Sequence, residues 1–182
     1  MTGRDLSILF ELIPENHKLI NFNTNTDGFS NGNKGAQLSE NIKKLNSIIG
    51  FNSFDIGHVF DRVAYGGVAY INALCSVNKA GGATGGVNGT AFYFVFAHEI
   101  GHQLGAPHTF NQNVGVTTNR VELGSGRTIM GYGPRGEDNL YYHAKSIKEI
   151  TALINQRNCG ATDNDYNNQQ PYYYIVISRF LH

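Results

Sequence analysis

Apolar residues along this 182-residue chain fall into short clusters separated by polar stretches, and the spacing within each cluster predicts its structure. Residues 6–13 and 55–60 are rich in leucine, β-branched and aromatic side chains and are bounded by turn-forming residues, as is typical of strands. Residues 66–75 form a third extended run. Gly66 and Gly67 at its start predict either a bulge or a place where a ligand backbone approaches closely.

Three other clusters predict helices. Apolar side chains recur at helical spacing between Ser39, which can cap the helix, and Gly50, which can end it in a left-handed conformation. Residues 91–97 are apolar on all sides, which favours a helix buried in the middle of a domain. Residues 146–157 form a final amphipathic helix.

The remaining segments are polar or rich in glycine. Residues 81–90 contain five glycines but lack the Gly-Lys-Ser/Thr ending of a phosphate-binding loop, so we expect a turn there. Residues 161–170 resemble a polar linker, and residues 172–181 predict either one strand or a terminal stub. Strands and helices together predict a mixed α/β (α+β) fold.

Charge and hydropathy exclude several partners. Lysine plus arginine and aspartate plus glutamate number 14 each, so the net charge gives no attraction to nucleic acid or to an anionic membrane. No apolar stretch is long enough to span a bilayer, so we expect no membrane insertion. The residues after Met1 do not have the pattern of a signal peptide.

One motif carries the chemistry. His98 and His102 are four residues apart, so on a helix they share a face and offer two nitrogens to one metal ion. Glu99 does not ligate but can reach a water held by that metal. Gly105 can end the helix, so that the chain turns and His108 approaches as a third ligand. Three protein ligands leave a fourth position open, which is typical of a catalytic rather than a structural zinc.

This arrangement predicts peptide hydrolysis without a covalent intermediate. Zinc would lower the pKa of its bound water and polarise a peptide carbonyl, while Glu99 takes the proton of the water and delivers it to the leaving amine. Met130, in a glycine-rich turn downstream, strengthens the zinc interpretation. The histidines without ligand spacing are expected to be structural or solvated: His17, His58, His143 and His182.

The spacing from His98 to His108, followed by Met130, resembles the signature of the metzincin zinc metalloendopeptidases. More narrowly, the chain is similar to the bacterial reprolysin-like (adamalysin-like) peptidases. The similar segments are residues 55–60, 66–69, 75, 98–110, 128–132 and 143–147.

The resemblance implies a metzincin-type zincin domain over residues 1–160, with residues 161–182 as a polar linker and C-terminal stub. Its upper lobe would hold a twisted, mostly parallel sheet with an antiparallel edge strand and helices. A small irregular lobe would follow Gly105, with the active-site cleft between the two lobes. A further strand and a long helix that begin such domains would precede Arg4, and this sequence does not contain them.

The resemblance also implies roles for particular residues. Substrate would lie extended along the edge strand at residues 66–73, including Gly66, Gly67, Val68 and Ala69, and would pair with it by strand addition. Met130 would underlie the three histidines as an apolar floor. Tyr132 is either a hydrogen-bond donor to the oxyanion or part of the substrate-pocket wall, and the wall is favoured slightly.

The two cysteines alone predict either one long-range disulfide or two free thiols. Cysteines in matching places are linked in the family, so the resemblance implies a Cys75–Cys159 disulfide. Asp163 and Asp165 do not support a calcium site, because two aspartates in a polar tail are more often solvated.

We therefore expect a secreted, monomeric zinc endopeptidase that acts on protein or peptide substrates. The alternative is a catalytically incompetent fragment that binds zinc or peptide without turnover.

Overall fold

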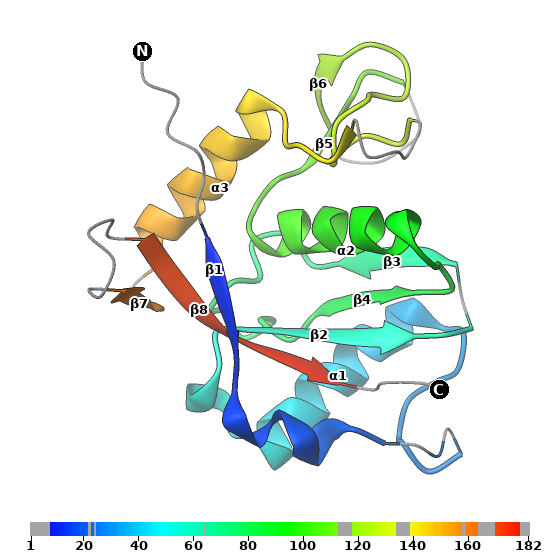
Figure 1. Cartoon of the computed structure of the whole chain (residues 1–182), viewed down its shortest axis with the longest axis vertical. Coiled ribbons are helices and arrows are strands. Elements are labelled where there is room, and N and C mark those ends of the chain that lie inside the picture. Colours follow the sequence, from blue (N-terminus) through cyan, green and yellow to red (C-terminus); the bar gives the residue numbers. More distant parts are fainter. Residues whose placement is uncertain are drawn as a thin grey trace.

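The computed structural model describes residues 8–21, 23, 25–63, 65–112, 118–133, 139–157, 159–163 and 170–178. Its centre is a six-stranded sheet in the order β1-β8-β2-β4-β3, with β7 pairing with β8 (Figure 1). These strands are β1 (Leu9–Leu12), β2 (Ile56–Asp61), β3 (Gly66–Ala69), β4 (Gly82–Gly85), β7 (Ala161–Asp163) and β8 (Gln170–Ser178). The strands β1, β8, β2 and β4 run parallel, and β3 is antiparallel to β4. The expected mostly parallel sheet with an antiparallel edge strand is confirmed.

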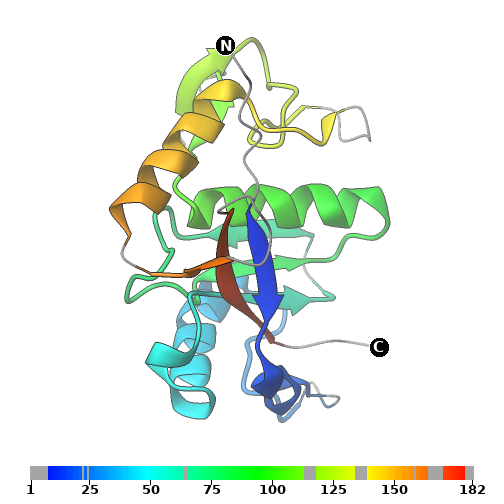
Figure 2. The same cartoon turned by 60° about the vertical axis from the view of Figure 1, so that its left-hand side comes forward.

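Helices cover both faces of this sheet. The α-helices are α1 (Lys34–Ile48), α2 (Thr90–Gln103) and α3 (Ala144–Gln156), and two 3-10 helices are η1 (Pro14–Leu19) and η2 (Phe51–Ser53). Figures 1 and 2 show α1 and α2 on opposite faces of the sheet. A second, two-stranded sheet of β5 (His108–Phe110) and β6 (Thr118–Glu122) lies beyond α2. The small lobe expected after Gly105 is therefore present.

Helix α1 begins earlier than the sequence predicted. The side chain of Asn33 accepts a hydrogen bond from the backbone N–H of Ala36, so Asn33 and not Ser39 caps the helix. Ser39 lies inside the helix and donates its hydroxyl to the Ala36 carbonyl. The predicted end is closer to the observed one, because Gly50 has a φ of 94° just after the last turn.

The prediction of a turn over residues 81–90 was wrong, because part of this segment forms β4. Gly82 lies in this strand because the packing leaves no room for a side chain. A β-carbon at Gly82 would lie 2.3 Å from Oε1 of Gln103 and 2.4 Å from Nδ1 of His58. The extended run after Gly66 is shorter than predicted, since β3 ends at Ala69.

The C-terminal strand β8 lies between β1 and β2 in the main sheet. The sequence suggested a linker and a stub for residues 161–182, with one strand as an open alternative. The side chain of Val176 is fully buried, and Ile175 and Ile177 are 6% and 7% exposed. Asn16 accepts a hydrogen bond from the Ile177 N–H at 2.7 Å. Strand β8 is therefore a buried, central part of the main sheet.

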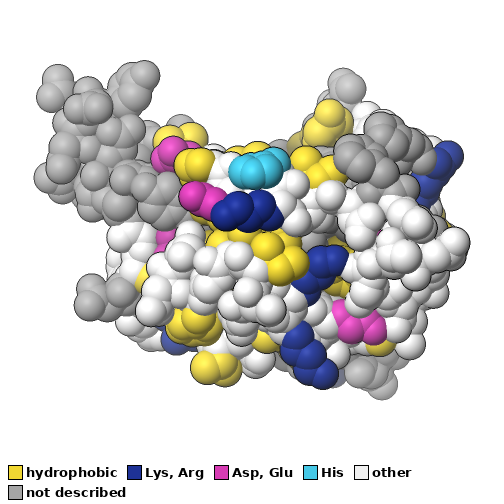
Figure 3. Space-filling model, turned by 90° about the horizontal axis from the view of Figure 1, so that it is seen from below, with side chains coloured by type: hydrophobic (Ala, Val, Ile, Leu, Met, Phe, Trp, Pro, Cys, Tyr) yellow, Lys and Arg dark blue, Asp and Glu magenta, His cyan; other side chains and the backbone are white. Residues whose placement is uncertain are grey.

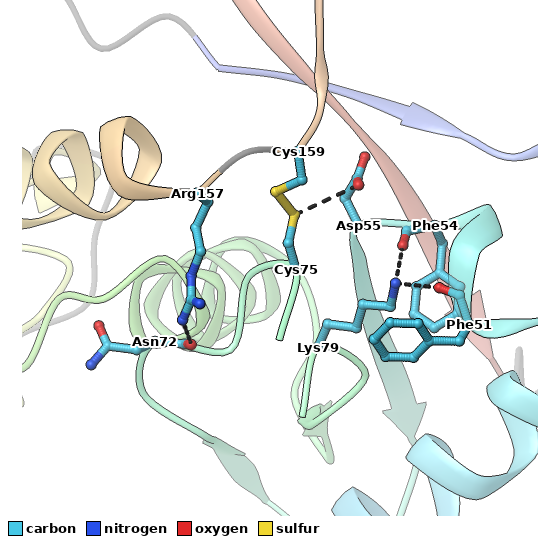
Figure 4. The surroundings of a disulfide bond; sticks show 8 residues. All are labelled: Phe51, Phe54, Asp55, Asn72, Cys75, Lys79, Arg157 and Cys159. Carbon is cyan, nitrogen blue, oxygen red and sulfur yellow. Dashed lines mark hydrogen bonds between the residues drawn. A yellow bond between two sulfur atoms is a disulfide. The ribbon is translucent and has the colours of Figure 1, made fainter. Parts of the chain in front are cut away.

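The disulfide implied by the resemblance is present. Cys75 and Cys159 are bonded, with their Cα atoms 6.4 Å apart, and join the turn after β3 to the segment after α3 (Figure 4). Beside it, Arg157 donates a hydrogen bond to the Asn72 carbonyl at 3.0 Å. The Lys79 ammonium donates to the Phe54 carbonyl at 2.6 Å and to that of Phe51. These contacts fix the chain that leads out of the edge strand.

The described surface is mixed in character. On the face seen in Figure 3, basic and acidic side chains both occur, with hydrophobic side chains scattered among them. Within the described ranges, none of the helices has the length and apolar character that crossing a membrane requires.

Candidate active site

The three motif histidines converge in the structure as the spacing predicted. His98 and His102 lie on the buried second half of α2, which packs against β3 and β4, and His108 begins β5. The first half of α2 is less buried than the sequence predicted, since Tyr93 is 65% exposed. Nε2 of His108 is 3.2 Å from Nε2 of His98 and 3.1 Å from Nε2 of His102. Three converging imidazole nitrogens are a donor set that fits zinc.

The turn between α2 and β5 brings the third histidine into place. Gly105 has a φ of 99°, a conformation that glycine adopts far more readily than other residues, which confirms its predicted role in ending the helix. The N–H of Ala106 then bonds to the Gly101 carbonyl at 2.8 Å. His108 can therefore return toward the helix that it has just left.

Backbone carbonyls orient two of the imidazoles. Nδ1 of His98 donates to the Ile129 carbonyl at 2.6 Å, and Nδ1 of His102 donates to the Ala106 carbonyl at 2.7 Å. A proton held on Nδ1 leaves the Nε2 lone pair free to ligate, so these bonds select the tautomer that a metal needs.

The electrostatics of the site also suit a metal. All three histidines are buried, with exposed fractions of 6–8%. Burial, and then the neighbouring His108, lower the pKa of His102 to about 4, against a smaller opposing effect of its bond to Ala106. The imidazole of His102 is therefore neutral at pH 7, as metal ligation requires.

Glu99 lies on α2 beside the histidines and is 5% exposed. Strand β3 passes directly against it. A β-carbon at Gly67 would lie 2.4 Å from Cγ and 2.5 Å from Oε1 of Glu99, closer than atoms can approach. Gly67 therefore provides the room for the Glu99 side chain, a contact that the sequence did not predict.

Met130 packs against the same helix. It is fully buried, and a β-carbon at Gly101 would lie 2.5 Å from its sulfur. Gly101 directly precedes His102, so Met130 packs on α2 next to this histidine in the sequence. The N–H of Gly131 bonds to the Thr128 carbonyl at 2.8 Å, which closes the tight turn that the sequence predicted.

Tyr132 borders the histidines on the solvent side. Its ring centroid is 4.7 Å from that of His108, 4.7 Å from that of Phe110 and 5.8 Å from that of His98. The side chain is 48% exposed. Tyr132 therefore forms an aromatic surface next to the converging imidazoles of His98 and His108.

These groups open into one cleft. A cavity of about 570 Å³ is lined by all of β3, by Tyr65, Ile71 and Tyr132, by Phe94, Val95 and Glu99 of α2, and by the three histidines. The predicted edge strand, Gly66, Gly67, Val68 and Ala69, and the predicted catalytic groups thus share one cavity.

Sequence reasoning missed a buried polar network at the end of α2. Gln103 is fully buried and donates to the carbonyls of Gly57 at 3.0 Å and Lys79 at 3.2 Å. Its Oε1 is 2.9 Å from Nδ1 of His58, whose Nε2 is 3.0 Å from the Thr84 hydroxyl. Burial lowers the pKa of His58 to about 4, although its bond to Gln103 opposes this. No spacing rule links these residues, since only the folded sheet brings them together.

Among the described residues, the other histidines do not belong to the group formed by His98, His102 and His108. His58 is the structural histidine that the sequence predicted, and His143 caps α3 by accepting from the Lys145 N–H at 3.0 Å. His17 is exposed and lies within hydrogen-bond distance of the Pro14 carbonyl. His182 lies outside the described residues, as do Asp165 and the side chain of Asp163.

Comparison with known families agrees with this geometry. Residues 1–163 match the family described as Metallo-peptidase family M12B Reprolysin-like. Among curated proteins, no significant match was found. The matched segment contains α2, all three histidines, the Met130 turn and both cysteines, whereas β8 lies beyond it. The chain therefore belongs to the reprolysin-like metallopeptidases of family M12B.

Proposed function

We propose that this protein is a zinc-dependent endopeptidase that hydrolyses peptide bonds in extended protein substrates. The observation that carries the proposal is the convergence of three buried Nε2 atoms beside the Glu99 carboxylate, in a cleft bordered by an edge strand. His98, His102 and His108 would hold the zinc. The bound ion would supply an acidified water and would polarise the scissile carbonyl.

Glu99 is the group that moves the proton. Its carboxylate lies on the same helix as two of the zinc ligands and faces the cleft, where it can take the proton of a water and pass it to the leaving amine. Its position against Gly67 restricts where the carboxylate can lie. A restricted carboxylate needs little reorganisation in the transition state.

Strand β3 is the surface that aligns the substrate. It ends the sheet order and is paired with β4 on one side, so its other edge can add an extended peptide through backbone hydrogen bonds. In this proposal, the register of that pairing places the scissile bond over the histidines.

The remaining cleft residues shape the site. Tyr132, which packs edge-to-face against His108, forms the wall of the substrate pocket, and Met130 forms the apolar floor below the histidines. The disulfide fits an oxidising environment, so we place the enzyme outside the cell and expect it to act as a monomer.

Casein cleavage tests the proposal. The purified chain is incubated with casein with and without a zinc chelator, beside Glu99→Ala. We expect cleavage that the chelator abolishes and that Glu99→Ala lowers by about 100-fold or more. Bound zinc with no chelator-sensitive cleavage would favour the alternative, a domain that binds zinc or peptide without turnover.

A further inference from the structure

A single carboxylate holds the start of the Met130 turn. Glu122, at the end of β6, accepts hydrogen bonds from the N–H of Arg127 at 2.8 Å, the N–H of Thr128 at 3.1 Å and the Thr128 hydroxyl at 2.5 Å. Hydrogen bonds to an ionised acceptor are about twice as strong as those between neutral groups. Glu122 therefore fixes the backbone at residues 127 and 128.

The backbone that Glu122 fixes leads directly into two groups at the metal centre. The carbonyl of Ile129, the next residue, accepts the Nδ1 proton of His98 at 2.6 Å. Met130 follows it and packs against α2 at Gly101. A shift of residue 128 would therefore move both the carbonyl that orients His98 and Met130, the proposed floor of the site.

Strand β6 also pairs with the strand that carries the third histidine. In the β5–β6 ladder, Phe110 is the register partner of Glu122, and β5 begins at His108. The Thr109 N–H bonds to the Met130 carbonyl at 3.2 Å, which closes the connection. Glu122 is thus joined through its backbone to the His108 strand and through its side chain to the Met130 turn.

The surroundings of Glu122 favour its charged form. Burial by itself would raise the pKa of this carboxyl group. The nearby hydroxyls of Thr109 and Thr128, together with the N–H groups of Arg127 and Thr128, outweigh burial and hold the pKa below its ordinary value. Gly126 lets the carboxylate lie close to the turn, since a β-carbon there would be 3.2 Å from Oε2 of Glu122.

We propose that Glu122 is a positioning residue for the zinc site, which sets metal affinity by locking the Met130 turn to the strand of His108. In this role Glu122 does not itself ligate the metal. It acts through Thr128 and the Ile129 carbonyl on His98, and through β5 on His108. This inference rests on the proposed zinc site, but not on turnover.

Zinc affinity of the metal-free full chain tests this role. Zinc is titrated in competition with a chromogenic chelator for the wild type, Glu122→Ala and Glu122→Gln. We expect Glu122→Ala to weaken zinc binding by about 10–100-fold, the usual effect of losing a group that orients metal ligands. The amide oxygen of Glu122→Gln can still accept from a backbone N–H, so this variant should lie between the other two.

Glu40→Ala is the matched control. The Glu40 carboxylate also holds a loop in place, because it accepts hydrogen bonds from the N–H of Ser30 at 2.8 Å and from the Ser30 hydroxyl at 2.5 Å. Glu40 lies on α1, however, on the other face of the sheet from α2. We expect Glu40→Ala to lower the unfolding temperature and leave zinc affinity unchanged. Thr128→Val removes the hydrogen bond from the Thr128 hydroxyl to Glu122 and should weaken zinc binding by about three- to tenfold, which tests the role even if Glu122→Ala does not fold.

Two results would overturn the inference. One is that Glu122→Ala binds zinc as tightly as the wild type. If Glu122→Ala does not fold, wild-type zinc affinity in Thr128→Val has the same meaning. The other is an equal loss of affinity in Glu40→Ala, which would mean that general loosening of the fold suffices. A wild type that binds zinc without cleaving casein would refute the proposed endopeptidase and leave this test intact.

Discussion

Gly67 and Glu99 are in such close contact that a methyl group on Gly67 would lie 2.4 Å from Cγ of the glutamate. This contact places β3, the proposed substrate-binding strand, against Glu99, the proposed proton carrier. A side chain at position 67 would push Glu99 away from its place beside the histidines.

Gly67→Ala should therefore lower kcat while leaving zinc binding and KM near wild type. The added methyl group would point at Glu99 and not along the outer edge of β3, so backbone pairing with substrate would persist. A displacement of about 1 Å at a reacting group can cost about 100-fold in rate, which is the loss we expect. Steady-state kinetics with a peptide substrate measure it.

Gly35→Ala is the control for this prediction. Gly35 lies in the first turn of α1, where an added β-carbon would be 3.6 Å from the Asn33 side chain, an ordinary contact. We expect wild-type kinetics. Full kcat in Gly67→Ala would contradict the role given to the contact with Glu99.

Ile175→Ala tests whether β8 is part of the folded core. Ile175 is 6% exposed and belongs to the same apolar cluster as Ile56 and Ile100. Replacing a buried isoleucine by alanine lowers the free energy of unfolding by about 2–5 kcal/mol, because contacts are lost and a cavity remains. Leu123→Ala, at a side chain that is 87% exposed, should change it by less than about 0.5 kcal/mol. Equal unfolding midpoints in denaturant for Ile175→Ala and the wild type would show that β8 contributes little to the stability of the core.

His58 makes the protein sensitive to mild acid. Its pKa is about 4 in the folded protein and near 6.5 in the unfolded chain, so only the unfolded chain gains a proton between these values. The contribution of His58 to the free energy of unfolding is therefore fully present above pH 6.5 and is lost as the pH falls toward 4. At about 1.4 kcal/mol per pH unit, the full loss is about 3 kcal/mol.

Denaturant unfolding of the metal-free protein at pH 7 and pH 5 measures this effect. His58→Gln should be less stable at pH 7, because the buried network is disturbed, but its stability should change less between the two pH values. An identical pH dependence in wild type and His58→Gln would show that another group is responsible.

Tyr132→Phe distinguishes the two roles left open for this residue. A pocket wall needs only the ring, so the variant should retain wild-type turnover, and we expect this result. Loss of an oxyanion donor would lower kcat by about 100-fold or more. Tyr132→Ala removes the ring that packs against His108 and Phe110 and should lower kcat/KM in either case.

The residues that the sequence revealed are those whose geometry is local. His98 and His102 share a helix face by spacing alone, and Gly105 turns the chain toward His108 within a few residues. Local propensity also placed α2, α3 and the turn around Met130. The Cys75–Cys159 pairing came from the family resemblance, because two distant cysteines do not reveal their partner.

Other features depend on contacts between distant parts of the chain. β4 has the composition of a turn, because Gly82 must make room for Gln103 and His58, which only the assembled sheet places there. The position of β8 follows from its pairing with β1 and β2, which sequence patterns do not encode. The link from Glu122 to His98 passes through Thr128 and Ile129 and has no signature in either segment.

The most direct test of the central claim is a zinc titration of the metal-free enzyme followed by cleavage of a peptide substrate. We expect the rate to rise with added zinc and to level off at one equivalent per chain, and Glu99→Ala to bind the same equivalent with almost no cleavage. Saturation with zinc without cleavage by the wild type, or cleavage that persists in the metal-free protein, would contradict this claim.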